Sequence, residues 1–472
     1  MSFILPCWQI AKKKSFRKSR GPCALSCTQR VRNRFEVSSA ANSCLGRPTQ
    51  HPATPRSIPS TQKPREARKL HPSNVAQKPK DILCENSEAV VRNVIIQHLE
   101  SCIFAEVVAA VDINTVANEV YKHNFPNTCI YPKTIEGITL AEFNKFDFDM
   151  ILMSPPCQPF TRLGAQKDVL DSRIKSFLYI LDLLPSLIKP PKYILLENVK
   201  GFETSVARDK LIQTLKNCGY SYQEFLLSPT LLGIPNSRLR YFLLAKLQPD
   251  AFCFQTFSQV LEQFPDCDSV EMTSSSFSRV LSADGSKKEE NNSNCSANEI
   301  ISKEDETVLY KLETLGHMKR KQSQDNNSSI QMIQNFLEEQ LEDPSPYFIS
   351  PKSLLRYALI LDIVGPTCRR SVCFTKGYGC YMEGTGSVLK TASDVELALV
   401  FLSFETMSED EKLTQLAKLK LRYFTPREIA NLHGFPPEFS FPEKISLKQR
   451  YRLLGNSLNI HVVAKLIKLM VD

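Results

Sequence analysis

The chain has 472 residues, of which 42% are hydrophobic, so it is long enough to build large cores in two or three domains. Its formal net charge is +9, but a total does not say where the charge lies. No apolar run approaches the roughly 18–20 residues that span a bilayer, which excludes a transmembrane helix and a membrane partner. The 15 cysteines are irregularly spaced without a Cys-x-x-Cys pair, so the sequence predicts a reducing compartment and no metal site.

The positive charge is concentrated in the first 80 residues. They contain 17 Lys and Arg, two acidic residues and nine prolines, whereas the rest of the chain carries a net charge of −6. Such a composition cannot bury enough apolar surface to offset chain entropy, so we expect a disordered basic extension over residues 1–80. We favour a solvated tail over a transit-like leader. An unusual alternative start or an erroneous gene model is a third explanation.

From residue 81 to residue 247, short apolar runs alternate with helical patterns, and polar residues follow the runs. This alternation predicts a doubly wound α/β sheet. The predicted strands are residues 106–111, 148–153, 193–196, 225–228 and 241–247. The predicted helices are residues 94–102, 114–124, 172–188 and 208–218.

The composition changes after residue 247. Residues 248–400 predict a second, smaller domain with a mobile insertion at about residues 265–345, which are rich in Ser, Asn, Glu, Asp and Lys. We assign residues 401–472 to a return into the first domain. There, Thr425 and Glu428 have the spacing of a capping box at a helix start, and residues 459–470 predict a terminal helix.

Three polar features lie where chemistry is expected in such a sheet. Cys157 stands in a Pro-Pro-Cys-Gln-Pro loop directly after a buried strand, so it lies on stiff backbone at the carboxyl edge, where ligands bind. Glu197 ends the next strand at the same edge. Strand alternation places Arg238 and Arg240 on one side, as a clamp for an anion or a pyrimidine carbonyl. Taken singly, each feature also fits a buried thiol or a solvated surface charge.

Together these features resemble the cytosine-5 methyltransferase family, with its PCQ, ENV and QxRxR motifs. The Cys373-Phe374-Thr375 sequence is similar to the branch of that family that methylates transfer RNA. The resemblance runs from about residue 100 to the end, interrupted by the insertion. Further matches are Phe424-Thr425-Pro426-Arg427-Glu428, Gly434-Phe435-Pro436 and Arg452-Leu453-Leu454-Gly455-Asn456-Ser457.

The resemblance implies a Rossmann-like S-adenosylmethionine methyltransferase core with a smaller target-recognition domain. It implies that the Cys157 thiolate adds to C6 of cytosine and that Glu197 holds N3 and the exocyclic amine. Arg238 and Arg240 would steady the pyrimidine carbonyl. The cofactor-binding residues that it implies are Asp112, Ile135, Glu136, Ser154, Asn456 and Ser457. Those that it implies for substrate recognition are Cys373, Phe374 and Thr375.

The implied substrate is a cytosine in tRNA, at position 38 in the anticodon loop of aspartate tRNA. A base in such a loop leaves its stack more readily than a base in a duplex. DNA is a weaker alternative partner. The resemblance implies a cytoplasmic location, with the nucleus as a second one. Because the body carries a net charge of −6, any RNA-binding patch must be local, and the sequence does not determine the oligomeric state.

The first motif of the family is missing. It should be a strand followed by a glycine-rich loop and a helix, whose backbone N–H groups receive the methionine end of the cofactor. No glycine occurs between Gly46 and Gly137, residues 90–93 read Val-Val-Arg-Asn where glycines are expected, and residues 82–84 are a weak substitute for the strand. We therefore keep three hypotheses: an active tRNA methyltransferase, a catalytically impaired RNA-binding relative, and a scaffold whose α/β body is a relic.

Overall fold

The computed structural model describes five parts of the chain, and all of them belong to one compact unit. The described residues are 7–13, 105–161, 167–265, 315–401 and 404–472. Within these ranges, no helix is both long and apolar enough to cross a bilayer. The predicted helix over residues 94–102 and most of the predicted basic extension lie outside the described residues.

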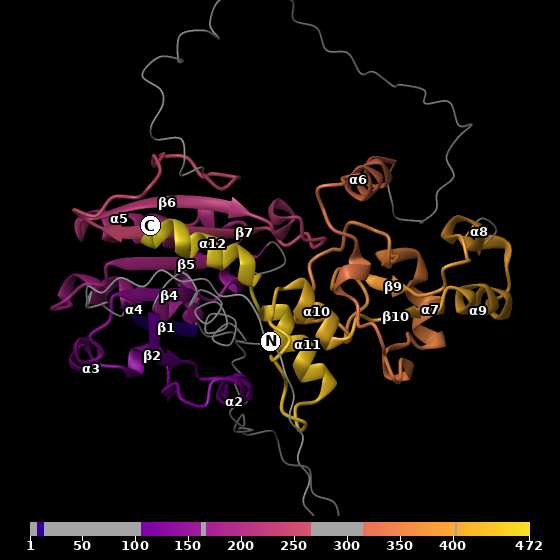
Figure 1. The fold of residues 1–472 in the computed structure, drawn as a ribbon, viewed down its shortest axis with the longest axis horizontal. Coiled ribbons are helices and arrows are strands. Elements are labelled where there is room, and N and C mark those ends of the chain that lie inside the picture. Colours follow the sequence, from indigo (N-terminus) through magenta and orange to yellow (C-terminus); the bar gives the residue numbers. More distant parts are fainter. Residues whose placement is uncertain (1–6, 14–104, 162–166, 266–314, 402–403) are drawn as a thin grey trace, which may run out of the picture. The chain divides into compact units, whose positions relative to one another are not determined.

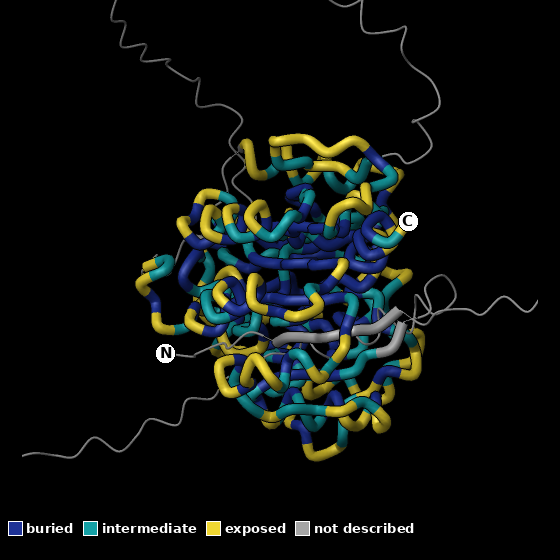
Figure 2. The backbone as a smooth tube through the Cα atoms, turned by 90° about the vertical axis from the view of Figure 1, so that its left-hand side faces the viewer, coloured by how far each residue is buried: buried dark blue, intermediate teal, exposed yellow. Residues whose placement is uncertain are grey.

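A seven-stranded sheet of order β3-β2-β1-β4-β5-β7-β6 forms the centre of the unit. β2 and β4 run parallel to β3 and β5, respectively, while β7 runs antiparallel to β5 and β6. β4, β5 and β7 are buried over almost their whole length, and Figure 2 shows buried segments running through the middle of the unit. The strands are β1 (Cys7–Lys13), β2 (Ala105–Val111), β3 (Ile130–Tyr131), β4 (Met150–Ser154), β5 (Tyr193–Val199), β6 (Tyr220–Leu227) and β7 (Arg240–Leu247). All five predicted strands are present within β2, β4, β5, β6 and β7, give or take two residues at an end.

Alternate residues of the strands face two separate hydrophobic clusters. In β4, Leu152 joins one cluster, while its neighbours Ile151 and Met153 join the other. Because strand side chains alternate between the faces of a sheet, both faces are covered, which confirms the doubly wound α/β prediction. One face carries α2 (Thr115–Asn124), α10 (Pro426–Leu432), α11 (Leu447–Asn456) and α12 (Ile460–Val471), and the other α3 (Leu140–Lys145), α4 (Lys175–Leu183) and α5 (Val206–Asn217). Figure 1 shows α12, which packs on β5 and β7.

Two helix starts follow the sequence signals, whereas one predicted helix is too long at both ends. The Asn114 side chain caps α2, and the predicted capping box of Thr425 and Glu428 is confirmed at the start of α10. The helix predicted over residues 172–188 is wrong at both ends: Ser172–Ile174 is a 3₁₀ turn, and α4 ends at Leu183. Pro185 lies in the 3₁₀ turn that follows, and a proline lacks the N–H that would continue the helix.

β1 lies inside the segment for which we expected disorder. It occupies the place between β2 and β4, antiparallel to both, where residues 82–84 are the weak candidate from the sequence. The prediction of disorder over residues 1–80 is therefore wrong for Cys7–Lys13. A place between two strands offers two rows of unpaired backbone groups, and an argument from side-chain burial does not count those hydrogen bonds.

A second sheet, of order β10-β9-β8, forms the smaller domain. Its hydrophobic cluster also includes Leu416 of α9 and Leu419 just after that helix, so the return to the first domain begins after β10 and not at residue 401. Near the start of the range predicted for the smaller domain, Leu261 forms a β-bridge with Phe225 of β6. This part of the chain therefore lies beside the first sheet. The elements are α7 (Pro351–Tyr357), β8 (Ile363–Val364), β9 (Val388–Lys390), α8 (Leu397–Phe401), α9 (Glu409–Lys418) and β10 (Leu421–Arg422).

The last part of the predicted mobile insertion is folded. Residues 315–345 include α6 (Leu315–Asp325) and a 3₁₀ turn in which Ile333 is completely buried. The prediction of a mobile insertion is therefore wrong for these residues, because their sparse apolar side chains insert into a core built by other segments. Residues 266–314 lie outside the described residues.

Candidate active site

Cys157 follows β4 at the carboxyl edge of the main sheet. Ser154, Pro155 and Pro156 before it are buried, while Cys157 itself is partly exposed. Asn198, near the end of β5, donates a hydrogen bond from Nδ2 to the Pro155 carbonyl oxygen over 3.2 Å. The neighbouring strand therefore fixes the backbone that presents the thiol.

The residue after the thiol is held by an arginine that sequence reasoning missed. Arg173 Nη1 donates to Gln158 Oε1 over 2.6 Å, and its Nε donates to Asp171 Oδ1 over 2.7 Å. The hydrogen bond to Asp171 raises the pKa of Arg173, so the guanidinium stays charged. The only sequence signal was the Asp-Ser-Arg spacing, which is also typical of an ordinary helix start.

The Cys157 thiol interacts electrostatically with three basic side chains. Arg173, Arg240 and Lys376 each interact with Cys157. Burial lowers the pKa of Lys376, and the Cys157 sulfur partly opposes that shift. The expected nucleophile therefore lies in a positively charged part of the site.

Glu197 and Arg240 form a buried ion pair at the same sheet edge. Glu197 is 4% exposed, and its Oε1 lies 3.5 Å from Arg240 Nε. The antiparallel register of β5 and β7 pairs Val199 with Arg240 and so places the two charges together. Burial alone would lower the pKa of Arg240, but Cys373 and Glu197 outweigh it and raise the pKa.

The Arg238 guanidinium donates hydrogen bonds to backbone carbonyl groups of the protein. Its Nη1 donates to the Phe374 carbonyl over 3.0 Å, and its Nη2 donates to the carbonyls of Gly455 and Ser457. The residue is 3% exposed. The two arginines that were expected to act together therefore differ: Arg240 faces Glu197, while Arg238 joins the end of α11 to the loop after Cys373.

Cys373 lies between the two arginines. Its Sγ accepts from Arg238 Nη1 over 3.1 Å and lies 3.6 Å from Arg240 Nη2. Burial opposes ionisation of this thiol, but Arg238 and Arg240 outweigh burial and lower its pKa. Phe374 is fully buried against Tyr378 and Phe424, so it anchors the loop in the core.

The sequence matches the model of a known protein family over most of its length. The family model described as C-5 cytosine-specific DNA methylase matches residues 95–472. This chain belongs to that family.

Its similarity to named relatives is extensive. It is 62% identical over 384 residues to the human tRNA (cytosine(38)-C(5))-methyltransferase, covering 79% of this chain and 95% of that protein. It is 38% identical over 378 residues to the protein of the same name from Spodoptera frugiperda, covering 79% and 94%. Among solved structures, a Spodoptera frugiperda DNMT2 variant matches with a TM-score of 0.62 at 34% identity, covering 82% of this chain and 98% of that one. The Dnmt2 methyltransferase of Schizosaccharomyces pombe has a TM-score of 0.58 at 30% identity, covering 82% and 96%. The predicted family and methyltransferase fold are thereby confirmed.

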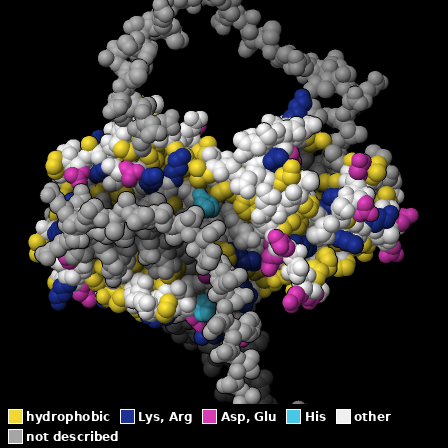
Figure 3. All heavy atoms as spheres, in the orientation of Figure 1, with side chains coloured by type: hydrophobic (Ala, Val, Ile, Leu, Met, Phe, Trp, Pro, Cys, Tyr) yellow, Lys and Arg dark blue, Asp and Glu magenta, His cyan; other side chains and the backbone are white. Residues whose placement is uncertain are grey.

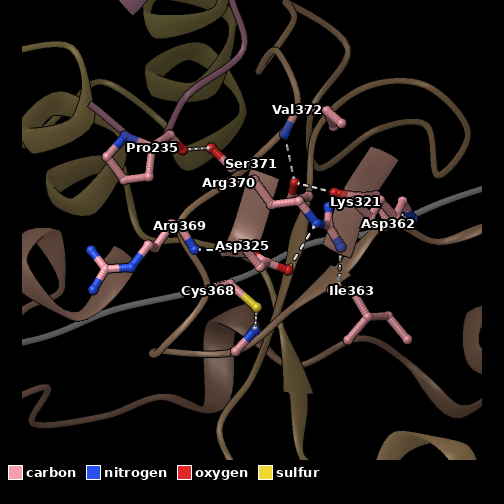
Figure 4. A network of polar contacts seen from close by, with 12 residues as sticks. Pro235, Lys321, Asp325, Asp362, Ile363, Cys368, Arg369, Arg370, Ser371 and Val372 are labelled. Carbon is pink, nitrogen blue, oxygen red and sulfur yellow. Dashed lines mark hydrogen bonds and ion pairs between the residues drawn. The ribbon is translucent and has the colours of Figure 1, made fainter. Parts of the chain in front are cut away.

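A partly buried ion network supports the loop that leads to Cys373. Asp362, which directly precedes β8, accepts from Arg370 Nη1 over 2.8 Å and from Lys321 of α6 over 2.9 Å. Arg370 Nε also lies 3.3 Å from Asp325. Figure 4 shows these side chains converging. The neighbouring Ser371 donates a hydrogen bond from Oγ to the carbonyl of Pro235, which precedes Arg238 and β7 in the chain. The network ties α6 to the candidate recognition loop.

The expected cofactor residues lie at two places along the sheet edge. Asp112 ends β2 and is buried, with its Oδ1 accepting from the Asn114 N–H over 2.8 Å. Ile135 is buried in the cluster beneath α4, and Glu136 accepts a hydrogen bond from Ser176 of that helix. A carboxylate beside buried apolar residues fits the ribose hydroxyls and the base of an adenosine. Of the other expected residues, Ser154 ends β4, while Asn456 ends α11 and Ser457 follows it, with its carbonyl accepting from Arg238.

Both signs of charge occur on the surface of the smaller domain. Figure 3 shows acidic and basic side chains over the part that carries α8 and α9, and the first turn of α9 contains Glu409, Asp410 and Glu411. On α6, Lys319 and Arg320 are exposed. These two cations add local positive charge to a body whose net charge is negative.

Proposed function

We propose that this chain transfers the methyl group of S-adenosylmethionine to C5 of a cytosine in tRNA, at position 38 of the anticodon loop of aspartate tRNA. The convergence of Cys157 with the buried pair of Glu197 and Arg240 at one sheet edge carries the proposal. The tRNA substrate is supported by the names of the human and Spodoptera relatives.

Cys157 is the nucleophile in this proposal. Its sulfur bonds to C6 of cytosine, and the electron pair displaced from the C5–C6 bond makes C5 nucleophilic. The cations Arg173, Arg240 and Lys376 interact with this sulfur and would stabilise its negative charge as the attacking thiolate. After C5 has gained its methyl group, a base removes the C5 proton, and that electron pair expels the Cys157 thiolate.

Glu197 and Arg240 bind the base. The Glu197 carboxyl group holds N3 and the exocyclic amine, which makes the ring accept the thiolate. Arg240 donates to the pyrimidine carbonyl, because its guanidinium faces the same edge as Glu197. Arg238 is a positioning residue, since its Nη atoms are bonded to protein carbonyls.

S-adenosylmethionine supplies an electrophilic methyl group when it is bound. Asp112 would hold its ribose hydroxyls, with Ile135 and Glu136 beside the adenine. Ser154, Asn456 and Ser457 would line the path from the cofactor to Cys157, in keeping with their places at the ends of β4 and α11.

A tRNA loop suits this site better than a duplex. The target base must leave its stack, which costs less in a loop, so DNA is the weaker partner. Lys319 and Arg320 of α6 would contact phosphates. The expected cytoplasmic location, with the nucleus as a second one, stays a prediction.

Methyl transfer to aspartate tRNA tests the proposal. Wild-type protein should label the tRNA from S-adenosylmethionine, and a cytosine-to-uracil change at position 38 should abolish labelling. Cys157→Ala should also abolish it, whereas Cys218→Ala, which changes another partly buried thiol, should not. Labelling that survives Cys157→Ala would refute the nucleophile, and labelling of the uracil-containing tRNA would refute the position.

A further inference from the structure

β1 occupies the place where the strand order of the main sheet reverses. β2 and β3 continue the sheet on one side of it, and β4 and β5 continue it on the other. In open α/β sheets, ligands bind at this place, outside the carboxyl ends of the strands. The direction of β1 therefore determines which backbone groups lie at this place for a ligand to contact.

The register shows that direction. Cys7, the first residue of β1, pairs with Ser154, the last residue of β4. Lys13, the last residue of β1, pairs with Ala105, the first residue of β2. The chain thus enters β1 at the carboxyl edge of its parallel neighbours and leaves it at the opposite edge.

A parallel strand at this place would leave the sheet at the carboxyl edge. The turn after it, with the first N–H groups of the following helix, binds anionic groups. Within the described residues, β1 supplies no such turn, because it ends at the opposite edge with Lys13. The sequence agrees, since no glycine between Gly46 and Gly137 is available for a tight turn with positive φ. In S-adenosylmethionine, the anionic group is the carboxylate of the methionine half.

The adenosine half meets a different part of the edge, which β1 leaves intact. β2 and β3 remain parallel, and Asp112 follows β2 directly, held by the Asn114 N–H. Ile135, which follows β3, is buried. The two halves of the cofactor therefore face unequal sites.

We propose that this chain binds S-adenosylmethionine through its adenosine half, and that the amino and carboxyl groups of the methionine half add little affinity. The inference rests on the proposed function for the identity of the cofactor. It predicts a methyltransferase that needs a higher cofactor concentration than a relative whose strand at this place is parallel. The antiparallel β1 thus restricts cofactor binding without altering the base pocket of Cys157, Glu197 and Arg240.

Calorimetry with two thioethers tests the inference. S-adenosylhomocysteine and 5′-methylthioadenosine share the adenosine and the sulfur, but only the first carries the amino and carboxyl groups. The full chain should bind both with dissociation constants within about threefold of each other. Each charge-assisted hydrogen bond to a carboxylate is worth more than about tenfold in affinity. Tighter binding of S-adenosylhomocysteine by about tenfold or more would overturn the inference and leave the proposed function standing.

Asp112→Asn identifies the half that holds the cofactor. The variant should weaken both thioethers by the same factor, about tenfold, because both use the adenosine site. A loss confined to S-adenosylhomocysteine would overturn the inference. Failure of both thioethers to bind wild-type protein would refute the cofactor in the proposed function, and the inference with it.

A cross-link tests the direction of β1 independently of cofactor affinity. Residues paired across antiparallel strands have Cβ atoms close enough for a disulfide. Ser154→Cys should therefore form a disulfide with the native Cys7, found as a linked peptide by mass spectrometry. In the comparison variant, Ser154→Cys with Cys7→Ser and Lys13→Cys, no link should form. A link from position 13 to position 154 would show a parallel strand and overturn the inference.

Discussion

Gly455 of α11 lies directly against the backbone of Thr375. A Cβ atom on Gly455 would overlap the Thr375 carbonyl carbon and the Lys376 nitrogen. Arg238 bonds to the carbonyls of both Gly455 and Phe374, so the end of α11 and the loop after Cys373 are held as one piece. The place where the last segment of the chain meets the candidate recognition loop thus allows no side chain.

Replacement of Gly455 should disturb both segments. We expect Gly455→Ala to lose about 1–3 kcal/mol of unfolding free energy, because the methyl group must displace backbone. Urea denaturation measures the loss. Gly365→Ala is the matched control, since a Cβ atom there meets nothing within 4 Å and should leave stability nearly unchanged. Equal stability of the Gly455 and Gly365 variants would contradict the close contact.

Replacement of Arg238, in the turn before β7, and of Arg240, at the start of β7, should affect different properties of the protein. Arg240→Gln should act mainly on catalysis and lower kcat by about 10²- to 10³-fold, because it removes a donor to the base, although the buried Glu197 also loses its cation. Arg238→Gln should lower the unfolding free energy by about 1–3 kcal/mol, because buried carbonyls lose their donors. Single-turnover kinetics and urea denaturation on both variants separate the effects. The reverse result would refute the division of roles between Arg238 and Arg240.

Asp362 should stabilise the smaller domain in a pH-dependent way. Burial alone would raise its pKa, but Arg370 and Lys321 outweigh burial and hold the pKa below its ordinary value of 3.8. A lowered carboxyl pKa contributes stability that is complete above the ordinary value and is lost as the pH falls through the folded pKa.

Asp362→Asn should therefore cost about 3–5 kcal/mol near neutral pH, because two cations lose their shared partner. The difference from wild type should shrink as the pH falls below about 4. Denaturation at several pH values measures it, with Asp394→Asn as a control at an exposed position. A difference that stays constant with pH would show that the ionised form of Asp362 contributes nothing.

Cys373 should contribute stability at alkaline pH. Its pKa is lowered from 9.0 because Arg238 and Arg240 outweigh the effect of burial. A lowered thiol pKa gives stability that is complete above about pH 9 and is lost as the pH falls through the folded value. The stability advantage of wild type over Cys373→Ser, measured by urea denaturation, should therefore grow as the pH is raised towards 9. Cys380→Ser, at an exposed thiol, should show no such trend.

The sequence by itself determined most elements of the first domain and the members of the candidate site. Apolar runs followed by polar residues predicted β2, β4 and β5, because a short local run is enough to define a buried strand. Cys157, Glu197 and Arg240 were found because motif and strand end coincide. The chain order of these motifs also predicted the family, which the match over residues 95–472 confirmed.

Only the tertiary structure decided which arginine faces Glu197 and what fills the centre of the sheet. The sequence pattern places Arg238 and Arg240 on the same side of the chain. They differ because Arg238, and not Arg240, donates to the carbonyls of Phe374, Gly455 and Ser457. The seven residues of β1 lack a strong strand pattern, and backbone pairing with β2 and β4 selects them. Both outcomes depend on hydrogen bonds between segments far apart in the chain, which local sequence patterns do not encode.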